Sequence, residues 1–160
     1  MVKRVYTACY CIVLILLFVA PATGMQAANA LTVHDPWVLE APPGMKVMAA
    51  YMTLKNNSAK DLIVTAVSSP AFNRVEMHKT VMNNDLASMI KQDTMTVKAG
   101  QDLLFKPGGN HLMLIGPKKP LKSGASVDIQ LTMSNGEYTT VTAPVRKFND
   151  MQHNRGGQRY

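Results

Sequence analysis

Two histidines and two methionines are spaced in this 160-residue chain so that they could form one metal site. They are His78, Met89, His111 and Met113, with ten residues between the first two and twenty-one between Met89 and His111. Imidazole and thioether groups are neutral, fairly soft donors, which suit Cu(I) far better than Mg²⁺, Ca²⁺ or Mn²⁺. His111 and Met113 are two residues apart, so both would point to one face of a β-strand. The four side chains therefore predict a Cu(I) site.

A β-hairpin would bring the first two donors together. Asn83 and Asn84 suit a two-residue turn, because Asn accepts a positive φ angle. The register that follows places three pairs on one face of the hairpin: His78 with Met89, Glu76 with Lys91, and Arg74 with Asp93. Directly opposed side chains lie about 5 Å apart at Cβ, which is close enough to share a metal. A single His and Met would be a weak indication, because Met commonly fills gaps in a core.

The spacing His-x10-Met-x21-His-x-Met resembles the signature of the PCuAC family of periplasmic copper chaperones. Further matches to that family lie along the chain: Asp35-Pro36-Trp37, Ala50-Tyr51-Met52, Glu76-Met77-His78 and Pro107-Gly108-Gly109. The resemblance covers about residues 31–145. It implies a cupredoxin-like Greek-key β-sandwich that binds one Cu(I) per chain. It also implies delivery of copper to the CuA centre of cytochrome c oxidase subunit II, directly or through a Sco-type thiol protein.

Residues 1–30 have the features of a signal peptide. Lys3 and Arg4 give a positive start, residues 8–20 form an apolar run, and Ala28-Asn29-Ala30 supplies a small-x-small cleavage pattern. The apolar run is shorter than the roughly 20 residues that span a bilayer. We therefore expect a periplasmic protein, cleaved near Ala30 and not stably inserted in the membrane, with an uncleaved N-terminal anchor as the alternative.

The mature chain would be a single domain without cysteine. Cleavage removes Cys9 and Cys11, which leaves no thiolate ligand and so excludes a blue-copper electron-transfer site. The remaining 130 residues suit one domain, which we place at residues 31–147. They carry 15 basic and 10 acidic residues, a formal charge of +5. For an exported protein this charge favours an acidic partner or an anionic surface over nucleic acid. We expect a monomer.

Alternating and short apolar segments predict an all-β fold. Eight or nine strands are expected, at residues 48–56, 62–67, 74–80, 87–91, 94–98, 102–106, 111–115, 127–131 and 138–145. Asn135-Gly136 is the strongest short hairpin signal in the sequence. Strands of this length and spacing are typical of an antiparallel sandwich or barrel.

Residues 148–160 form a polar tail with little to bury, for which we expect disorder. The tail contains Met151 and His153, so a weaker second copper site is conceivable there. His34, near the mature N-terminus, is more typical of a structural or exposed residue than of a ligand.

The sequence favours a metal carrier over an enzyme. It has no cysteine nucleophile after cleavage, and no Ser/His/Asp arrangement follows from the spacing. Two other functions stay open: a periplasmic copper buffer or resistance protein with the same ligands, and a metal-free Ig-like interaction module. Deletion phenotypes separate delivery from buffering, and Cu(I) titration identifies a metal-free module.

Overall fold

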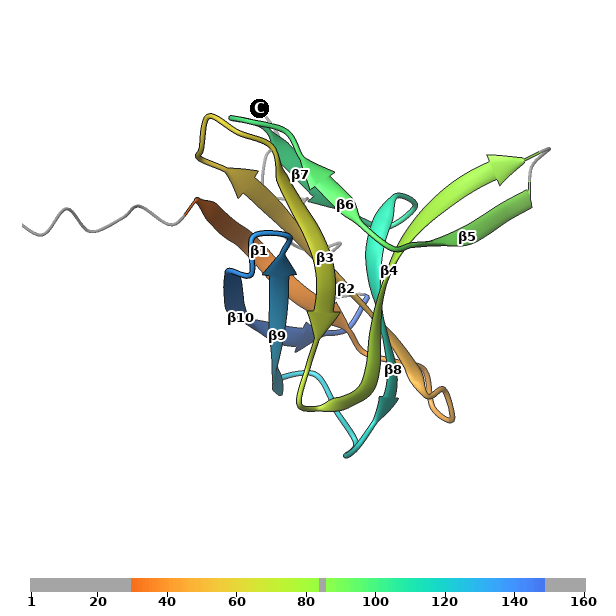
Figure 1. Cartoon of the computed structure of the whole chain (residues 1–160). Coiled ribbons are helices and arrows are strands. Elements are labelled where there is room, and N and C mark those ends of the chain that lie inside the picture. Colours follow the sequence, from red (N-terminus) through yellow and green to blue (C-terminus); the bar gives the residue numbers. More distant parts are fainter. Residues whose placement is uncertain (1–29, 84–85, 149–160) are drawn as a thin grey trace, which may run out of the picture.

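The computed structural model describes residues 30–83 and 86–148, and this part of the chain is built from strands (Figure 1). The ten strands are β1 (Leu31–Leu39), β2 (Val47–Asn56), β3 (Leu62–Ser68), β4 (Phe72–Asn83), β5 (Leu86–Gln92), β6 (Met95–Val97), β7 (Asp102–Phe105), β8 (Asn110–Pro117), β9 (Ser126–Met133) and β10 (Tyr138–Arg146). None of the described residues forms a helix long and apolar enough to cross a membrane. The all-β prediction is confirmed.

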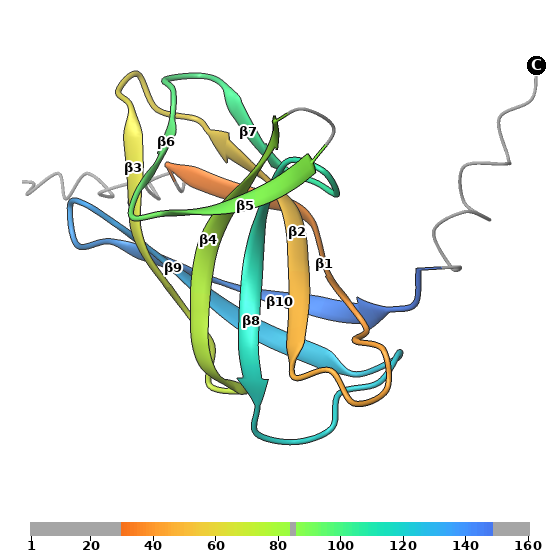
Figure 2. The same ribbon diagram turned by 90° about the vertical axis from the view of Figure 1, so that its right-hand side faces the viewer.

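The strands form one continuous hydrogen-bonded series that folds over a core. Its order is β5-β4-β8-β7-β2-β1-β10-β9-β3-β6, and β8 also pairs directly with β2. Most neighbours are antiparallel, whereas β1 pairs in parallel with β10 at Val38 and Val145 and so joins the two halves of the series. Figure 2 shows β4, β8 and β2 passing in front of β9 and β10. This arrangement is the cupredoxin-like antiparallel sandwich that the sequence predicted.

The core takes alternate residues from each strand. In β2, Met48, Ala50, Met52 and Leu54 are buried, as the alternation predicted. Because side chains alternate across a strand, the residues between them lie on the opposite face of the sheet. The same rule applies to β8 and to the middle of β4, where Met77, Leu112 and Leu114 belong to the core. Their alternate neighbours, including the predicted metal donors, are therefore on the face away from the core.

Strand β1 was not predicted from the sequence. It pairs with β2, but the register shifts between His34 and Trp37, and Asp35 has a φ of 47°. This irregularity removes the regular alternation on which strand prediction depends. Beyond the irregularity, Trp37 packs on Tyr51 of β2 with ring centroids 4.5 Å apart. Strand β1 is therefore stabilised by its pairing and packing with β2, and its own sequence does not show the alternation of a strand.

The predicted register of the β4–β5 hairpin is wrong by two residues. His78 lies opposite Lys91, Thr80 opposite Met89, and Asn83 opposite Leu86. The connection therefore falls at residues 84–85, which lie outside the described residues, and not at Asn83-Asn84. A shift of two preserves the face of every side chain, because the side-chain period of a strand is two. The hairpin extends away from the body of the sandwich (Figure 1).

The predicted turn at Asn135-Gly136 is confirmed. Gly136 has a φ of 85°, a conformation that glycine adopts without steric cost, and its N–H donates to the Met133 carbonyl. The Met133 N–H in turn donates to the Glu137 carbonyl at 2.8 Å. The turn connects β9 to β10, whose paired residues run from Thr132 opposite Tyr138 to Ser126 opposite Pro144.

The far end of β2 is fixed by a buried asparagine. The Asn56 side chain is fully buried, and its amide nitrogen donates to the carbonyls of Lys60 (2.7 Å) and Val97 (2.9 Å). Its side-chain oxygen accepts from the backbone N–H of Ser58 at 2.9 Å and from the Ser58 hydroxyl at 2.8 Å. Both the nitrogen and the oxygen of this amide therefore form two hydrogen bonds each. Through them, one side chain connects β2, the turn that follows it and β6.

Candidate metal centre

The two histidines lie directly opposite each other on neighbouring strands. His78 of β4 pairs with His111 of β8. Their ring centroids are 5.8 Å apart and the ring planes are inclined by 35°. Both residues are buried, with exposed fractions of 9% for His78 and 5% for His111. The β4–β8 pairing thus brings together two donors that are 33 residues apart in the chain.

One nitrogen of each ring is hydrogen-bonded and the other is not. His111 Nδ1 lies 3.1 Å from the Gly109 carbonyl, which can only accept, so Nδ1 carries the proton. His78 Nε2 lies 3.0 Å from Glu76 Oε2, and an ionised carboxylate likewise can only accept. The remaining nitrogens, His78 Nδ1 and His111 Nε2, are the buried side-chain nitrogen or oxygen atoms without a partner in the described part of the chain. Each has a free lone pair.

Such buried, unpartnered nitrogens call for a physical explanation, since a buried polar atom without a hydrogen bond costs about 1–3 kcal/mol. A metal ion would use both lone pairs at once. Histidines that ligate metals characteristically donate their second ring N–H to a carboxylate or a backbone carbonyl. Glu76 and Gly109 are one partner of each kind. The site therefore fits a metal bound through His78 Nδ1 and His111 Nε2.

Met113 lies on the same face as the two histidines. It is two residues beyond His111 on β8 and opposite Glu76 of β4, which is itself two residues before His78. Met113 is half-buried. Its thioether is thus held on a central strand beside the imidazole pair, as the His-x-Met spacing predicted.

Met89 lies on that face too, but at the rim. It is opposite Thr80 on the projecting hairpin and is 61% exposed. His78 is its diagonal neighbour, and a diagonal contact of the same kind is seen one pair along, where Lys91 Nζ is 3.6 Å from Glu76 Oε1. Diagonal neighbours are within reach of long side chains. The corrected register therefore keeps Met89 available to the site as an exposed donor.

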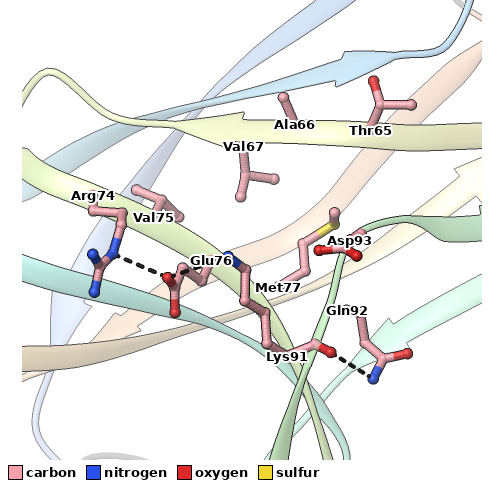
Figure 3. A pocket seen from close by; sticks show the side chains of 10 residues that line it. All are labelled: Thr65, Ala66, Val67, Arg74, Val75, Glu76, Met77, Lys91, Gln92 and Asp93. Carbon is pink, nitrogen blue, oxygen red and sulfur yellow. Dashed lines mark hydrogen bonds and ion pairs between the residues drawn. The ribbon is translucent and has the colours of Figure 1, made fainter.

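Glu76 is surrounded by positive or proton-donating groups. Arg74 Nε lies 3.0 Å from Oε1, on the same oxygen that Lys91 approaches, and His78 Nε2 lies on Oε2. The hydrogen bond from His78 is the main cause that lowers the pKa of the Glu76 carboxyl, and the charges of Arg74 and Lys91 lower the pKa further. Figure 3 shows Glu76 between Arg74 and Lys91, at the wall of a cavity of about 240 Å³.

The contact of Glu76 with His78 was not predicted from the sequence. Glu76 was predicted as a cross-strand partner of Lys91, and that ion pair is present across the diagonal. The spacing of two between Glu76 and His78 was the available signal, because it places both on one face of a strand. Arg74, predicted opposite Asp93, instead forms its ion pair with Glu76.

Of the remaining candidate donors, the structure describes only His34. His34 is exposed on β1, where its Nε2 lies 3.4 Å from the Thr32 hydroxyl. Met151 and His153 lie outside the described residues, and so do Cys9 and Cys11.

A family model matches residues 31–145 of the chain, and its description is "Putative lipoprotein LpqE-like". The chain belongs to the LpqE-like family. This LpqE-like protein is similar to two relatives over most of its length. It is 33% identical over 139 residues to a protein of Leifsonia xyli subsp. xyli named "Putative lipoprotein Lxx21020", covering 86% of this chain and 82% of the relative. It is 31% identical over 140 residues to an uncharacterized protein of Rickettsia prowazekii, covering 83% and 75%.

Solved structures similar to the LpqE-like protein include PCuAC domains, which confirms the resemblance found from the donor spacing. The apo form of DR1885 from Deinococcus radiodurans is 30% identical, with a TM-score of 0.58 and coverage of 91% of this chain and 97% of that one. The CuI form of DR1885 is 29% identical, with a TM-score of 0.59 and coverage of 79% and 84%. The copper-bound PCuAC domain of PmoF2 has a TM-score of 0.64 over 76% and 96%; at 20% identity it shows the shared fold.

Proposed function

We propose that this LpqE-like protein binds one Cu(I) through His78, His111, Met113 and Met89, and that it carries copper in the periplasm. The observation that supports the proposal most directly is the pair of buried imidazole nitrogens without partners, one from each of two directly paired strands. The copper-bound state of two relatives, DR1885 and the PmoF2 domain, agrees with it.

The donor set suits transport of Cu(I) better than permanent storage. Two imidazoles and two thioethers contribute no charge, so bound Cu⁺ remains a net cation held by donor bonds alone. Thiolates are stronger soft ligands, and an acceptor that carries them would take the ion downhill. Because Met89 is exposed at the rim, it is the donor that an acceptor ligand can displace first. The function is that of a carrier and not of an enzyme.

The proposed acceptor is the CuA centre of cytochrome c oxidase subunit II, reached directly or through a Sco-type thiol protein. Loss of the gene should then lower the copper content of the oxidase and leave copper tolerance unchanged. A fall in tolerance with a fully loaded oxidase would instead identify a copper buffer. Export with cleavage after Ala30 belongs to the same proposal. The intact mass of the exported chain tests it, and a mass that retains Cys9 and Cys11 would indicate an anchored protein.

Titration of the purified mature chain tests the metal itself. We expect one tightly bound Cu(I) in competition with a colorimetric chelator, and much weaker Zn(II) binding, because thioethers are poor ligands for Zn²⁺. The same titration on a chain that ends at Lys147 should give the same tight site, since all four donors precede the tail. At most a weaker second event involving Met151 and His153 should disappear. A tight site that is lost with the tail would contradict the four-residue assignment.

A further inference from the structure

We propose that Glu76 is a positioning residue for copper binding: it holds the His78 ring in the tautomer that offers Nδ1, and it ties the strand of Met89 to the strand of His78. The metal part of this inference rests on the proposed function. The tautomer part does not, because it concerns the metal-free chain.

One oxygen of the Glu76 carboxylate, Oε2, determines the tautomer of His78. Oε2 lies 3.0 Å from His78 Nε2, while Oε1 forms an ion pair with the Arg74 guanidinium at 3.0 Å, as an ionised carboxylate does. An ionised carboxylate has no proton to donate, so the contact exists only when Nε2 carries the hydrogen. The lone pair is then on Nδ1, which is buried and without a partner. Without the carboxylate nothing described at Nε2 would favour this tautomer, and part of the population would present a protonated Nδ1 to the metal.

The two histidines differ in what fixes them. The His111 tautomer is set by the Gly109 carbonyl, a backbone group that no side-chain substitution removes. The His78 tautomer is set by a side chain, so it can be changed by mutation. His111 therefore serves as an internal control for any change that is specific to Glu76.

The other oxygen of the carboxylate, Oε1, connects β4 to β5. Oε1 forms two ion pairs, one with Arg74 Nε of its own strand at 3.0 Å and one with Lys91 Nζ of β5 at 3.6 Å. The Lys91 contact crosses the hairpin along the same diagonal that relates Met89 to His78. One carboxylate thus contacts the imidazole donor with one oxygen and, with the other, the strand that carries the exposed thioether donor.

The test compares Glu76→Ala and Glu76→Gln with the parent chain and with Glu40→Ala. Glu40 is a matched control, because its side chain has the same exposed fraction of 14% and binds a lysine, Lys122, at 3.5 Å and a backbone N–H, that of Ser123, at 2.9 Å. Nitrogen-15 NMR of the metal-free proteins at alkaline pH gives the tautomer of each ring. Competition with a chelator gives the Cu(I) affinity, and thermal melts report folding.

In the parent we expect His78 protonated at Nε2 and His111 at Nδ1. In Glu76→Ala, His78 should become a mixture of tautomers while His111 is unchanged, and Cu(I) affinity should fall about 10- to 100-fold, as for other partners of ligating histidines. Glu76→Gln keeps an oxygen that can accept from Nε2–H, so it should retain the tautomer and lose less affinity. Glu40→Ala should match the parent in both measurements.

A His78 ring protonated at Nδ1 in the parent, or one whose tautomer is the same in the parent and in Glu76→Ala, overturns the inference. If Glu76→Ala does not fold, Glu76→Gln decides. Its Cu(I) affinity is then compared with that of a His78→Ala variant measured in the same way, and an equally large loss of affinity overturns the positioning role. Failure of the parent to bind Cu(I) would instead refute the proposed function and leave the tautomer result valid.

Discussion

Replacement of both His78 and His111 by alanine should abolish Cu(I) binding. The double variant removes the two lone pairs that are buried together on β4 and β8. Loss of a hydrogen-bond partner of a ligating histidine already costs about 10- to 100-fold in affinity, so loss of both ligands should cost more than about 100-fold. Chelator competition measures the effect.

The fold should survive this double substitution. Each alanine leaves a void, because both rings are buried, but it also removes a nitrogen that has no hydrogen bond in the metal-free chain. These two effects oppose each other, so a cooperative thermal transition should remain. His34→Ala is the control, since His34 is exposed on β1. A folded double variant that binds Cu(I) like the parent would contradict the site.

Substitution of the two methionines, Met113 and Met89, should lower the Cu(I) affinity by different amounts, because their surroundings differ. Met113→Leu and Met89→Leu keep a similar apolar volume, so each should cost less than about 1.5 kcal/mol of stability. Met113 is half-buried on a central strand, whereas Met89 is exposed on the projecting hairpin. A held donor loses less freedom on binding than a mobile one, and we therefore expect the larger fall in Cu(I) affinity in Met113→Leu.

Asn56→Ala should lower the free energy of unfolding by about 3 kcal/mol, since each buried polar group that loses its partner costs about 1–3 kcal/mol. The substitution leaves the Lys60 and Val97 carbonyls without the amide donor, and the Ser58 N–H without its acceptor. The side chain is fully buried, so water does not reach its place without local opening. Urea denaturation of the parent and the variant gives the difference.

Asn73→Ala is the matched control for this prediction, because Asn73 is an exposed asparagine on β4. Surface substitutions of this kind usually change stability by no more than about 0.5 kcal/mol. Equal midpoints for Asn56→Ala and the parent, at equal denaturant dependence, would mean that the turn after β2 does not depend on this amide.

Several features followed from local sequence alone. The alternation of Met48, Ala50, Met52 and Leu54 predicted which face of β2 is buried, and Asn135-Gly136 predicted a turn. The spacing of His111 and Met113 predicted a shared face. Each of these depends on residues close together in the chain, where the period of a strand and the φ preferences of Asn and Gly decide the outcome.

The register of the β4–β5 hairpin was decided by the tertiary structure. A register with His78 opposite Met89 and one with His78 opposite Lys91 place the same side chains on the same face, because they differ by two residues. Face alternation therefore could not distinguish them. The Glu76–Lys91 ion pair is compatible with both registers. The two side chains are directly opposed in the predicted register and diagonal neighbours in the observed one.

For the candidate metal centre, too, the sequence determined some features and the tertiary structure decided the others. The sequence determined the donor types, because the imidazole of His and the thioether of Met are the same chemical groups in any fold. Only the pairing of β4 with β8 placed His78 beside His111, across 33 residues of chain. Only the contacts of Glu76 and Gly109 decided which nitrogen of each ring is free. The physical reason is that a tautomer depends on the partner at a ring's other nitrogen, and the fold determines that partner.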